Sequence, residues 1–381
     1  MLPAPSTDAL AHSQRVTAHL AALIDGAGGW IPFSRFMEAA LYAPGLGYYA
    51  AGAMKFGAAG DFVTAPELTP LFGRTLAHAI APVLAETGAE VLELGAGSGQ
   101  LAMDMLGELE RIGTLPSRYC ILEVSADLRQ RQQENLARTR PHIAGRVQWM
   151  DALPSHFSGV IFGNEVLDAL PVELVHWTAT GPLIRGVALE GDVFVWREHP
   201  IADPTLRARA GALNLPPGYV SEINLAADGL IASLAQCLER GLILMIDYGF
   251  GESEYYHPQR HMGTLRAHYR HHALDDPFYL PGLCDLTAHV DFSAVARAGE
   301  ATGLALAGYV SQANFLLNSG LAELLMDSSP ADAAAYLPQA NAVQRLVSPA
   351  EMGELFKVIA LTKGVGTPLA GFSRGDRRHS L

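Results

Sequence analysis

Residues 91–101 read VLELGAGSGQL, and this stretch decides the fold class. Val91 to Leu94 is a short apolar run of the kind that forms a buried strand, and three glycines at every second position follow it. Glycines directly after a strand permit a tight turn, let a ligand approach the backbone and allow a helix to pack closely behind. The first N–H groups of that helix would offer hydrogen bonds and partial positive charge to an anionic ligand group. The stretch therefore predicts a nucleotide-type binding loop.

Strand and helix patterns alternate along the chain after this loop. Leu101, Met105 and Leu109 share one helical face, and Tyr119 to Val124 has the apolar composition of a buried strand. Strands that alternate with helices are typical of a parallel sheet with right-handed crossovers. We therefore predict an α/β fold with a doubly wound, Rossmann-like sheet. The expected strands are 91–94, 119–124, 147–150, 160–162, 242–246, 305–310 and 355–362, and the expected helices are 101–109, 127–138, 164–170 and 226–240.

Segments outside this alternation predict additions to the sheet. An apolar stripe indicates a helix over 12–24, and the capping-box pair Thr64 and Glu67 predicts a helix from there to about Glu86. Residues 172–177, 184–189 and 192–196 have the pattern of antiparallel strands. The expected organisation is an N-terminal extension that covers the site (1–88), the first half of the sheet domain (89–171), an insertion (172–240), the second half (241–364) and a flexible tail (365–381).

Composition restricts the class of partner. The chain has 381 residues, a formal net charge of −13, 49% hydrophobic residues and 17% charged residues. A protein that neutralises nucleic-acid phosphates normally presents a basic surface, so this charge argues against nucleic acid and suits a positively charged substrate. No apolar run approaches the ~20 residues of a membrane span. Three well-separated cysteines and the lack of a recognisable leader lead us to expect a cytoplasmic protein with no membrane insertion.

Acidic residues near the ends of the first three expected strands indicate what the loop binds. Glu93 lies two residues before Gly95, where we expect it to reach the amino group of a cofactor that carries an amino acid. Glu123 closes the second strand and is placed to accept hydrogen bonds from ribose hydroxyls. Asp151 follows the third strand, within range of an adenine amino group. Gln100 stands where a dinucleotide site has its last glycine, so NAD is disfavoured.

The stretch from Glu93 to Gly99 resembles the first motif of class I methyltransferases, and Glu123 and Asp151 stand in the positions of the next two. Four further segments resemble the MidA family, whose mitochondrial members help assemble respiratory complex I. This resemblance covers about 30–364. It implies S-adenosyl-L-methionine as the cofactor and an arginine side chain of a complex I subunit as the methyl acceptor. The four segments are GDFVTAPE (60–67), GNEVLDALP (163–171), IDYG (246–249) and DLTAHVDF (285–292).

Candidate cofactor contacts follow from the loop and from the resemblance together. The resemblance places segment 60–67 over the cofactor, which adds two residues to those around the loop; Glu67 we interpret only as a helix cap. The full candidate set is Glu93, Gly95, Ala96, Gly97, Ser98, Gly99, Glu123, Val124, Asp151, Ala152, Phe62 and Thr64.

Asn164, Glu165 and Asp168 are the candidate catalytic residues, because they follow the fourth expected strand at the edge where such sheets bind ligands. An arginine acceptor must lose a proton during transfer, and carboxylates bind its guanidinium bidentately. On a helix, Glu165 and Asp168 would share a face, so we expect both to hold the guanidinium while Asn164 contacts cofactor or substrate. Alternatively, Asn164 caps this helix and both acids favour its first turn.

Other functions are compatible with the same residues. They are a small-molecule methyltransferase and an assembly factor that binds the cofactor without turnover. The Asn/Asp-Pro-Pro-aromatic tetrad that favours amino groups of nucleic-acid bases is not present at 164–167. The insertion either shapes a substrate groove or forms a homodimer interface. Five histidines invite a metal interpretation, but Tyr, Arg and Pro are mixed among them, so we expect a loop over the active site and no metal. They are His257, His261, His268, His271 and His272.

Overall fold

The computed structural model describes residues 2–50, 64–327 and 332–381, and the chain divides into two units. Unit 1 comprises Met1–Ala53, Asp168–Asp228 and Glu252–Asp291, and unit 2 comprises Met54–Leu167, Gly229–Gly251 and Phe292–Leu381. Residues of the expected N-terminal extension (1–88) fall in both units, and its helices between 64 and 88 belong to unit 2.

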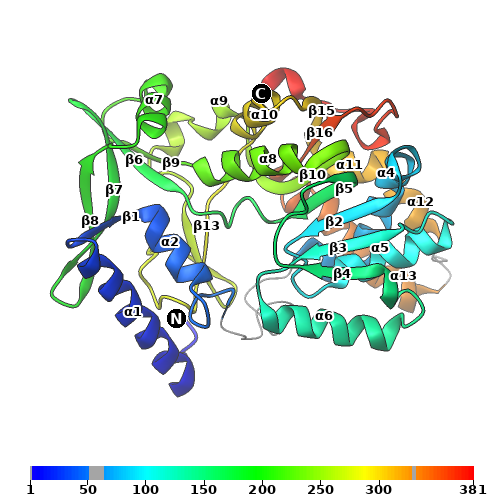
Figure 1. The fold of residues 1–381 in the computed structure, drawn as a ribbon, viewed down its shortest axis with the longest axis horizontal. Helices are drawn as coiled ribbons and strands as arrows, with labels where there is room; N and C mark the ends of the chain where they lie inside the picture. Colours follow the sequence, from blue (N-terminus) through cyan, green and yellow to red (C-terminus); the bar gives the residue numbers. More distant parts are fainter. Residues whose placement is uncertain (1, 51–63, 328–331) are drawn as a thin grey trace. The chain divides into compact units, whose positions relative to one another are not determined.

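Unit 2 is built on a mixed sheet with the strand order β15-β16-β10-β5-β2-β3-β4 (Figure 1). The pairs β2–β3, β3–β4, β2–β5 and β5–β10 are parallel, while β16 pairs antiparallel with β10 and β15. Because β2 lies between β3 and β5, the connections leave it in opposite directions, which makes its carboxyl end the topological switch point. The predicted α/β fold is confirmed. The strands are β2 (Glu90–Leu94), β3 (Arg118–Leu122), β4 (Val147–Met150), β5 (Phe157–Asn164), β10 (Leu238–Phe250), β15 (Ala305–Ser311) and β16 (Phe356–Lys363).

Helices pack against both faces of this sheet. Leu242, Leu244 and Ile246 of β10 join the core that α4 and α5 also form, while Ile243 and Met245 are buried on the opposite face because side chains alternate along a strand. Helix α10 packs against β15 and β16. The helices are α3 (Ala65–Leu68), α4 (Pro70–Thr87), α5 (Gln100–Arg111), α6 (Ala126–Thr139), α8 (Leu225–Cys237), α10 (Phe292–Ala301), α11 (Gln312–Asn318), α12 (Leu321–Met326), α13 (Ala333–Val347) and α14 (Met352–Leu355).

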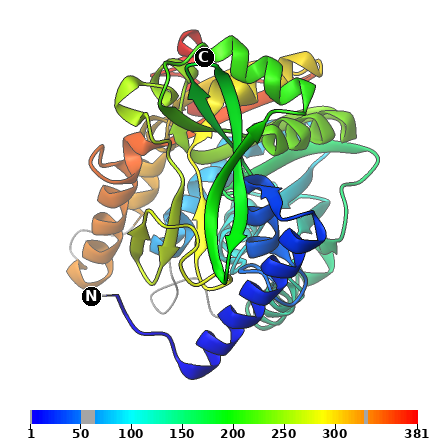
Figure 2. The ribbon, with the colours of Figure 1, turned by 90° about the vertical axis from the view of Figure 1, so that its left-hand side faces the viewer.

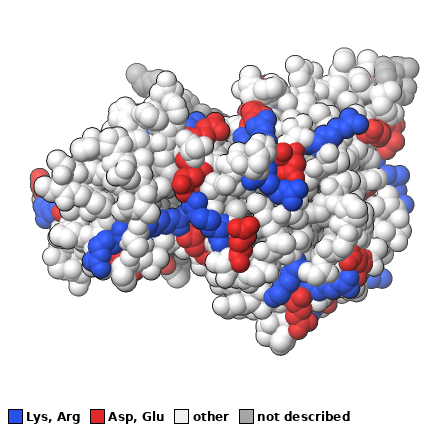
Figure 3. All heavy atoms as spheres, turned by 90° about the horizontal axis from the view of Figure 1, so that it is seen from above, with Lys and Arg blue, Asp and Glu red and all other residues white. Residues whose placement is uncertain are grey.

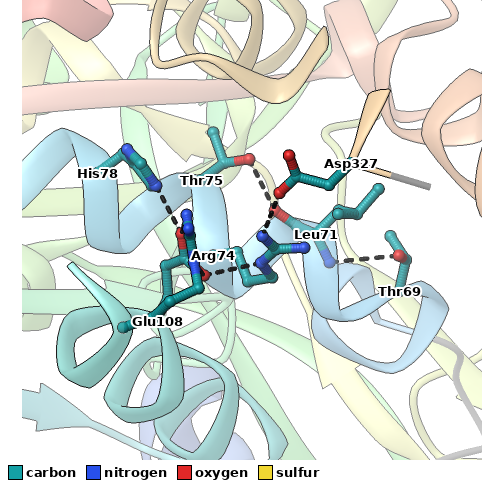
Figure 4. Close-up of polar contacts among 8 residues, drawn as sticks. Thr69, Leu71, Arg74, Thr75, His78, Glu108 and Asp327 are labelled. Atoms are coloured by element: carbon teal, nitrogen blue, oxygen red, sulfur yellow. Dashed lines mark hydrogen bonds and ion pairs between the residues drawn. The ribbon is translucent and has the colours of Figure 1, made fainter. Parts of the chain in front are cut away.

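The buried carboxylate of Glu108 links α4 to α5, the helix that follows the glycine loop (Figure 4). The Glu108 carboxylate accepts hydrogen bonds from Arg74 (2.8 Å) and His78 (2.6 Å) of α4, and from Arg111 (3.0 Å) of its own helix. Arg74 also pairs with Asp327 at 2.8 Å. Burial by itself would raise the pKa of Glu108, but the hydrogen bonds from Arg111, Arg74 and His78 outweigh it and lower the pKa to about 2. The charged network therefore links the carboxyl-terminal half of α5 to α4.

Unit 1 contains two antiparallel sheets, so the antiparallel strands expected between 172 and 196 are confirmed. The larger has the order β1-β7-β6-β9 with β8 paired to β7, and the smaller has the order β12-β11-β13. The long β7–β8 hairpin is the green ribbon that faces the viewer in Figure 2. The elements are α1 (Thr7–Gly26), β1 (Trp30–Pro32), α2 (Phe33–Tyr42), β6 (Glu173–Thr178), β7 (Gly181–Glu190), β8 (Val193–Pro200), α7 (Pro204–Leu213), β9 (Tyr219–Ile223), α9 (Glu252–Tyr255), β11 (Arg266–Tyr269), β12 (His272–Leu274), β13 (Asp285–Thr287) and β14 (Val290–Asp291).

Two expected helices are wrong. The helix expected from Thr64 to Glu86 is interrupted at Thr69, whose extended backbone (φ −165°) separates α3 from α4 and whose hydroxyl caps Leu71 at 3.2 Å. Thr64 makes no side-chain capping bond, so the capping box does not form. The helix expected over 164–170 is also absent, because β5 continues to Asn164 and Glu165 then takes a left-handed conformation (φ 54°).

The flexible tail expected over 365–381 instead packs against unit 2. Phe372 is buried and its ring lies 5.4 Å from that of Phe315. The Arg377 N–H donates to the Tyr309 carbonyl at 2.7 Å, and the Arg377 guanidinium pairs with Glu354. Each partner lies at least 23 residues before the tail residue that it contacts, so the local pattern of the tail does not indicate it.

On the face drawn in Figure 3, cationic and anionic side chains are interspersed, and neither sign forms a continuous field. No helix in the described ranges combines the length and the apolar composition that crossing a membrane requires.

Candidate active site

The glycine loop forms a left-handed turn between β2 and α5. Gly95, Gly97 and Gly99 have φ values of 61°, 54° and 79°, a region that side chains disfavour. The Gly95 N–H donates to Leu122 O at 3.0 Å, and the Gly99 N–H donates to Ala96 O at 2.8 Å. A Cβ atom on Gly99 would lie 2.9 Å from Gln132 Cγ. The first turn of α5 thus begins directly at the loop, as the sequence predicts.

Gln132 of α6 connects the loop to the acid expected to bind ribose. Its amide nitrogen donates to Gly97 O at 2.8 Å and to Glu123 Oε2 at 3.2 Å, and its amide oxygen accepts from the Trp149 indole at 2.8 Å. The other oxygen of Glu123 accepts from Ser125 N at 2.9 Å. Burial raises the pKa of Glu123 above its ordinary value. The loop and the acid are therefore connected by a side chain of the protein itself.

Glu93 has a less accessible position. Its side chain is 2% exposed on β2, and one carboxylate oxygen accepts from the Tyr119 hydroxyl at 2.7 Å. Burial raises the pKa of Glu93 to about 8, with the nearby charge of Glu123 acting in the same direction. At neutral pH the Glu93 carboxyl is therefore mostly protonated. Its role as the ligand of the cofactor amino group stays a prediction.

The residues expected around the adenine are at the surface after β3 and β4. Val124 is 77% exposed, which is unusual for an apolar side chain beside a buried acid and suits stacking against a flat apolar ring. The exposed Asp151 pairs with Arg129 at 2.7 Å, and the same guanidinium donates to the carbonyls of Glu123 and Met150. The neighbouring Ala152 is also exposed. Through Arg129, these contacts place Asp151 close to Glu123.

The turn after β5 presents Asn164 and Glu165 at the same carboxyl edge. The Asn164 amide donates to Glu165 Oε1 at 3.0 Å, and the Glu165 N–H donates to Ile246 O at 2.9 Å. Asp247 of β10 fixes the turn, because its Oδ2 accepts from Val166 N at 3.1 Å and from Leu167 N at 2.9 Å. Its Oδ1 accepts from Tyr248 N at 2.9 Å. Asp247 is 1% exposed, so these bonds are shielded from water.

Asp168 begins the next segment of unit 1 and is buried there. Its backbone carbonyl accepts from Ala288 N at 3.0 Å. Its charge acts on Tyr49, whose pKa is raised well above its ordinary value by burial first, then by Asp285, with Asp168 a smaller contributor. The expectation that Glu165 and Asp168 share one helical face is wrong, because no helix forms there.

Glu67 has a partner that the sequence did not indicate. The Ser98 hydroxyl in the glycine loop donates to Glu67 Oε1, and the same hydroxyl oxygen accepts from Gln100 N at 3.2 Å. Thr64, a candidate cofactor contact, occupies the N-cap position of α3. Phe62, the other candidate in this segment, lies outside the described residues.

The histidine-rich segment forms irregular structure and the β11–β12 hairpin in unit 1. His268 lies in β11 and His272 in β12, and His271 has a φ of 65° in the turn between them. Among the residues that the structure describes, no group of three or more His, Cys, Asp or Glu side chains has the arrangement of a metal site.

Three residues at the site were missed from the sequence: Gln132, Asp247 and Glu67. Gln132 had a detectable signal, because it stands between Leu128 and Leu136 at four-residue spacing, a position that faces the core of a helix. Asp247 stands inside a strongly apolar strand pattern, where a buried acid requires local donors. Glu67 had no such signal, since its apparent capping pattern pointed elsewhere.

Comparison with known proteins agrees with this geometry. A family model described as “Putative S-adenosyl-L-methionine-dependent methyltransferase” matches residues 75–310. A crystal structure from Burkholderia thailandensis, of a protein bound to S-adenosyl-homocysteine, is 51% identical with a TM-score of 0.97 and covers 100% of both chains. The protein arginine methyltransferase NDUFAF7, mitochondrial, of Danio rerio is 27% identical over 95% of this chain and 93% of its own. Its Drosophila melanogaster homolog is 29% identical over 91% and 86%.

The names of these relatives correct one expectation. Both are named mitochondrial proteins, so the expected cytoplasmic location is wrong. That expectation rested on the number and spacing of the cysteines and on the N-terminal sequence, neither of which specifies a compartment. The chain belongs to the matched family, and it is an S-adenosyl-L-methionine-dependent methyltransferase with S-adenosyl-L-methionine as its cofactor.

Proposed function

We propose that this enzyme is a protein arginine N-methyltransferase whose acceptor is a subunit of respiratory complex I. The names of the curated relatives support an arginine acceptor. The observation that carries the proposal is the strained position of Glu165, because a side chain held at φ 54° directly after β5 indicates a functional constraint. A carboxylate in that position suits a guanidinium.

The chemistry needs positioning and one proton acceptor. Bound S-adenosyl-L-methionine supplies an electrophilic methyl group whose transfer leaves the sulfur with the electron pair of the broken C–S bond. Glu165 would hold the guanidinium so that one nitrogen lies in line with that bond, ~3–3.5 Å from the methyl carbon. The guanidinium has a pKa above ~12, so it keeps its proton until the new N–C bond forms. The Glu165 carboxylate then takes this proton.

Asn164 would orient Glu165 through the amide bond to Oε1, and its own Oδ1 is buried without a hydrogen bond in the described structure. A buried acceptor without a donor is costly, so a ligand N–H is its natural partner. Asp168 stays a candidate second acid for the guanidinium. Glu93, Glu123, Val124 and Asp151 stay the candidate contacts for the cofactor.

Glu165→Gln tests this assignment. We expect turnover to fall by about three orders of magnitude or more, since a neutral amide neither attracts the guanidinium nor accepts its proton, while affinity for S-adenosyl-homocysteine stays near that of the wild type. Methyl transfer is measured with trideuteromethyl-labelled donor and a mitochondrial lysate, followed by mass spectrometry of peptides. Glu190→Gln, at the exposed β7–β8 turn, is the matched control.

The destination of the label separates the alternatives. Label on arginine of a complex I subunit supports the proposal. Label confined to the small-molecule fraction contradicts it in favour of a small-molecule methyltransferase. If no labelled methyl group is transferred although the cofactor binds normally, the result indicates an assembly factor without turnover.

A further inference from the structure

Glu67 is a carboxylate at the glycine loop to which the described residues offer no cationic partner. One of its oxygens accepts from the Ser98 hydroxyl in the loop. Within the part of the chain that the structure describes, neither a hydrogen bond to the other oxygen nor an ion pair to Glu67 is formed. The side chain is half-buried, so water screens its charge only in part. A half-buried, uncompensated carboxylate creates a position that favours a cation.

A second acid, Asp104, lies near this position. Asp104 of α5 lies close enough for its pKa to respond to Glu67. Burial raises the pKa of Asp104 to about 6, and the Glu67 charge contributes in the same direction against the opposing effects of Gln100 and Arg140. The Gln100 amide donates to both oxygens of Asp104, at 2.9 and 3.0 Å. Asp104 is therefore engaged, whereas no hydrogen bond within the described residues occupies the second oxygen of Glu67.

We propose that Glu67 binds the α-ammonium group of S-adenosyl-L-methionine. The loop then matches both ends of an α-amino acid: Glu67 receives the ammonium group, and the amino end of α5, a helix of twelve residues, favours the carboxylate. An ammonium group donates hydrogen bonds to a carboxylate, which the sulfonium of the cofactor does not. The inference depends on the cofactor and not on the arginine acceptor.

This assignment competes with the expectation for Glu93. That side chain is 2% exposed and already accepts from Tyr119, so a cation that approached it would leave water and enter the interior of the sheet. The two assignments predict different outcomes for one pair of substitutions. Glu67→Gln alters a half-buried side chain that contacts the loop, whereas Glu93→Gln alters one that is buried within the sheet.

Calorimetric titration of the full chain with three ligands tests the proposal. S-adenosyl-L-methionine has both the ammonium and the sulfonium, S-adenosyl-homocysteine has only the ammonium, and 5′-methylthioadenosine has neither. We expect Glu67→Gln to weaken the first two by about tenfold each, which is the loss of one charge-assisted hydrogen bond, and to leave the third unchanged. Glu110→Gln, at the far end of α5, is the matched control, and Glu93→Gln should weaken the two ligands that carry the ammonium less than Glu67→Gln does.

Four results would overturn the proposal. Unchanged binding of all three ligands shows that Glu67 does not contact the cofactor. A loss confined to S-adenosyl-L-methionine assigns Glu67 to the sulfonium. Equal losses for all three show that Glu67 only shapes the loop. A selective loss in Glu93→Gln instead of Glu67→Gln returns the amine to Glu93. If Glu67→Gln does not fold, Glu67→Asp decides by the same comparison, because its shorter carboxylate must still weaken S-adenosyl-homocysteine more than 5′-methylthioadenosine.

Discussion

Two turns at the carboxyl edge of one sheet reach the left-handed conformation by different means. After β2, three glycines with φ values of 54° to 79° adopt it without a side-chain penalty. After β5, Glu165 adopts it with a full side chain, and Asp247, about 80 residues away in the chain, receives the next two N–H groups. The first conformation is a property of the residue type, and the second is imposed by a tertiary partner. The four predictions below test that distinction.

The glycine turn should be broken by any side chain at Gly99, and this is the largest expected effect. Gly99→Val places a β-branched residue at φ 79° and sets its Cβ about 2.9 Å from Gln132. Backbone strain of about 1–3 kcal/mol, together with displacement of Gln132 from Gly97 and Glu123, should lower affinity for S-adenosyl-homocysteine by about 100-fold. Titration calorimetry measures this loss. Gly113→Val, at a positive-φ turn with open space around it, is the control, and equal binding by both variants would contradict the prediction.

The turn after β5 should depend on Asp247. Asp247→Asn replaces an acceptor that serves three N–H groups with an amide that serves them incompletely, which should destabilise the fold by about 1–3 kcal/mol. Turnover should fall more than cofactor affinity, because the glycine loop keeps its own geometry. Urea unfolding and the separate measurement of kcat and Kd check both parts. Asp192→Asn, in an exposed turn of unit 1, is the control; a drop in cofactor affinity equal to the drop in kcat would contradict this explanation.

Glycine at position 165 should adopt the positive φ of this turn without the steric penalty that a side chain carries. We expect Glu165→Gly to be about 1 kcal/mol more stable than Glu165→Ala, since both lack the carboxylate but only alanine keeps the steric conflict at φ 54°. Both variants should be inactive. Urea unfolding of the pair provides the measurement. Equal stabilities would show that no strain is stored at this position.

The smallest effect is expected at Glu86, which accepts from consecutive backbone N–H groups as Asp247 does but is partly exposed. Glu86 accepts from the N–H groups of Gly366 and Thr367 at 3.0 and 2.8 Å. The Thr367 hydroxyl and these two amides lower the pKa of Glu86 from its ordinary 4.5 to about 2. Because the folded pKa is the lower one, this stabilisation is complete above about pH 4.5 and disappears as the pH falls toward 2.

Glu86→Gln should therefore lower the unfolding midpoint at pH 7 by less than Asp247→Asn does, because water reaches the partly exposed Glu86 carboxylate and screens its charge. The difference from the wild type should shrink at pH 3. Thermal unfolding at the two pH values measures it. If the difference in unfolding midpoint between Glu86→Gln and the wild type grew on acidification, the lowered pKa of Glu86 could not be its cause.

The comparison of the two turns also explains which parts of the site the sequence could predict. Strands 147–150 and 91–94 and the helix 101–109 were predictable because periodicity is a local property, and the glycine loop was predictable because glycine itself permits the turn. The expected helix over 164–170 was wrong because an Asn followed by acids is typical of a helix start, and nothing local indicates that Asp247 takes up the N–H groups.

Other failures have the same physical cause. The Thr64–Glu67 pattern has the local spacing of a capping box, yet Glu67 binds Ser98, 31 residues later. The polar segment after 365 has the composition of a loose tail, yet Phe372 finds an apolar site beside Phe315.

By itself, the sequence determined the alternation of strands and helices, the left-handed glycine loop after β2 and the class of cofactor, because each follows from the residue types within a few positions. Only the tertiary structure decided the conformation of Glu165, the partner of Glu67 and the link from Gln132 to Glu123. The reason is that a polar group takes the hydrogen-bond partner that folding brings to it, and in these cases that partner lies on another element.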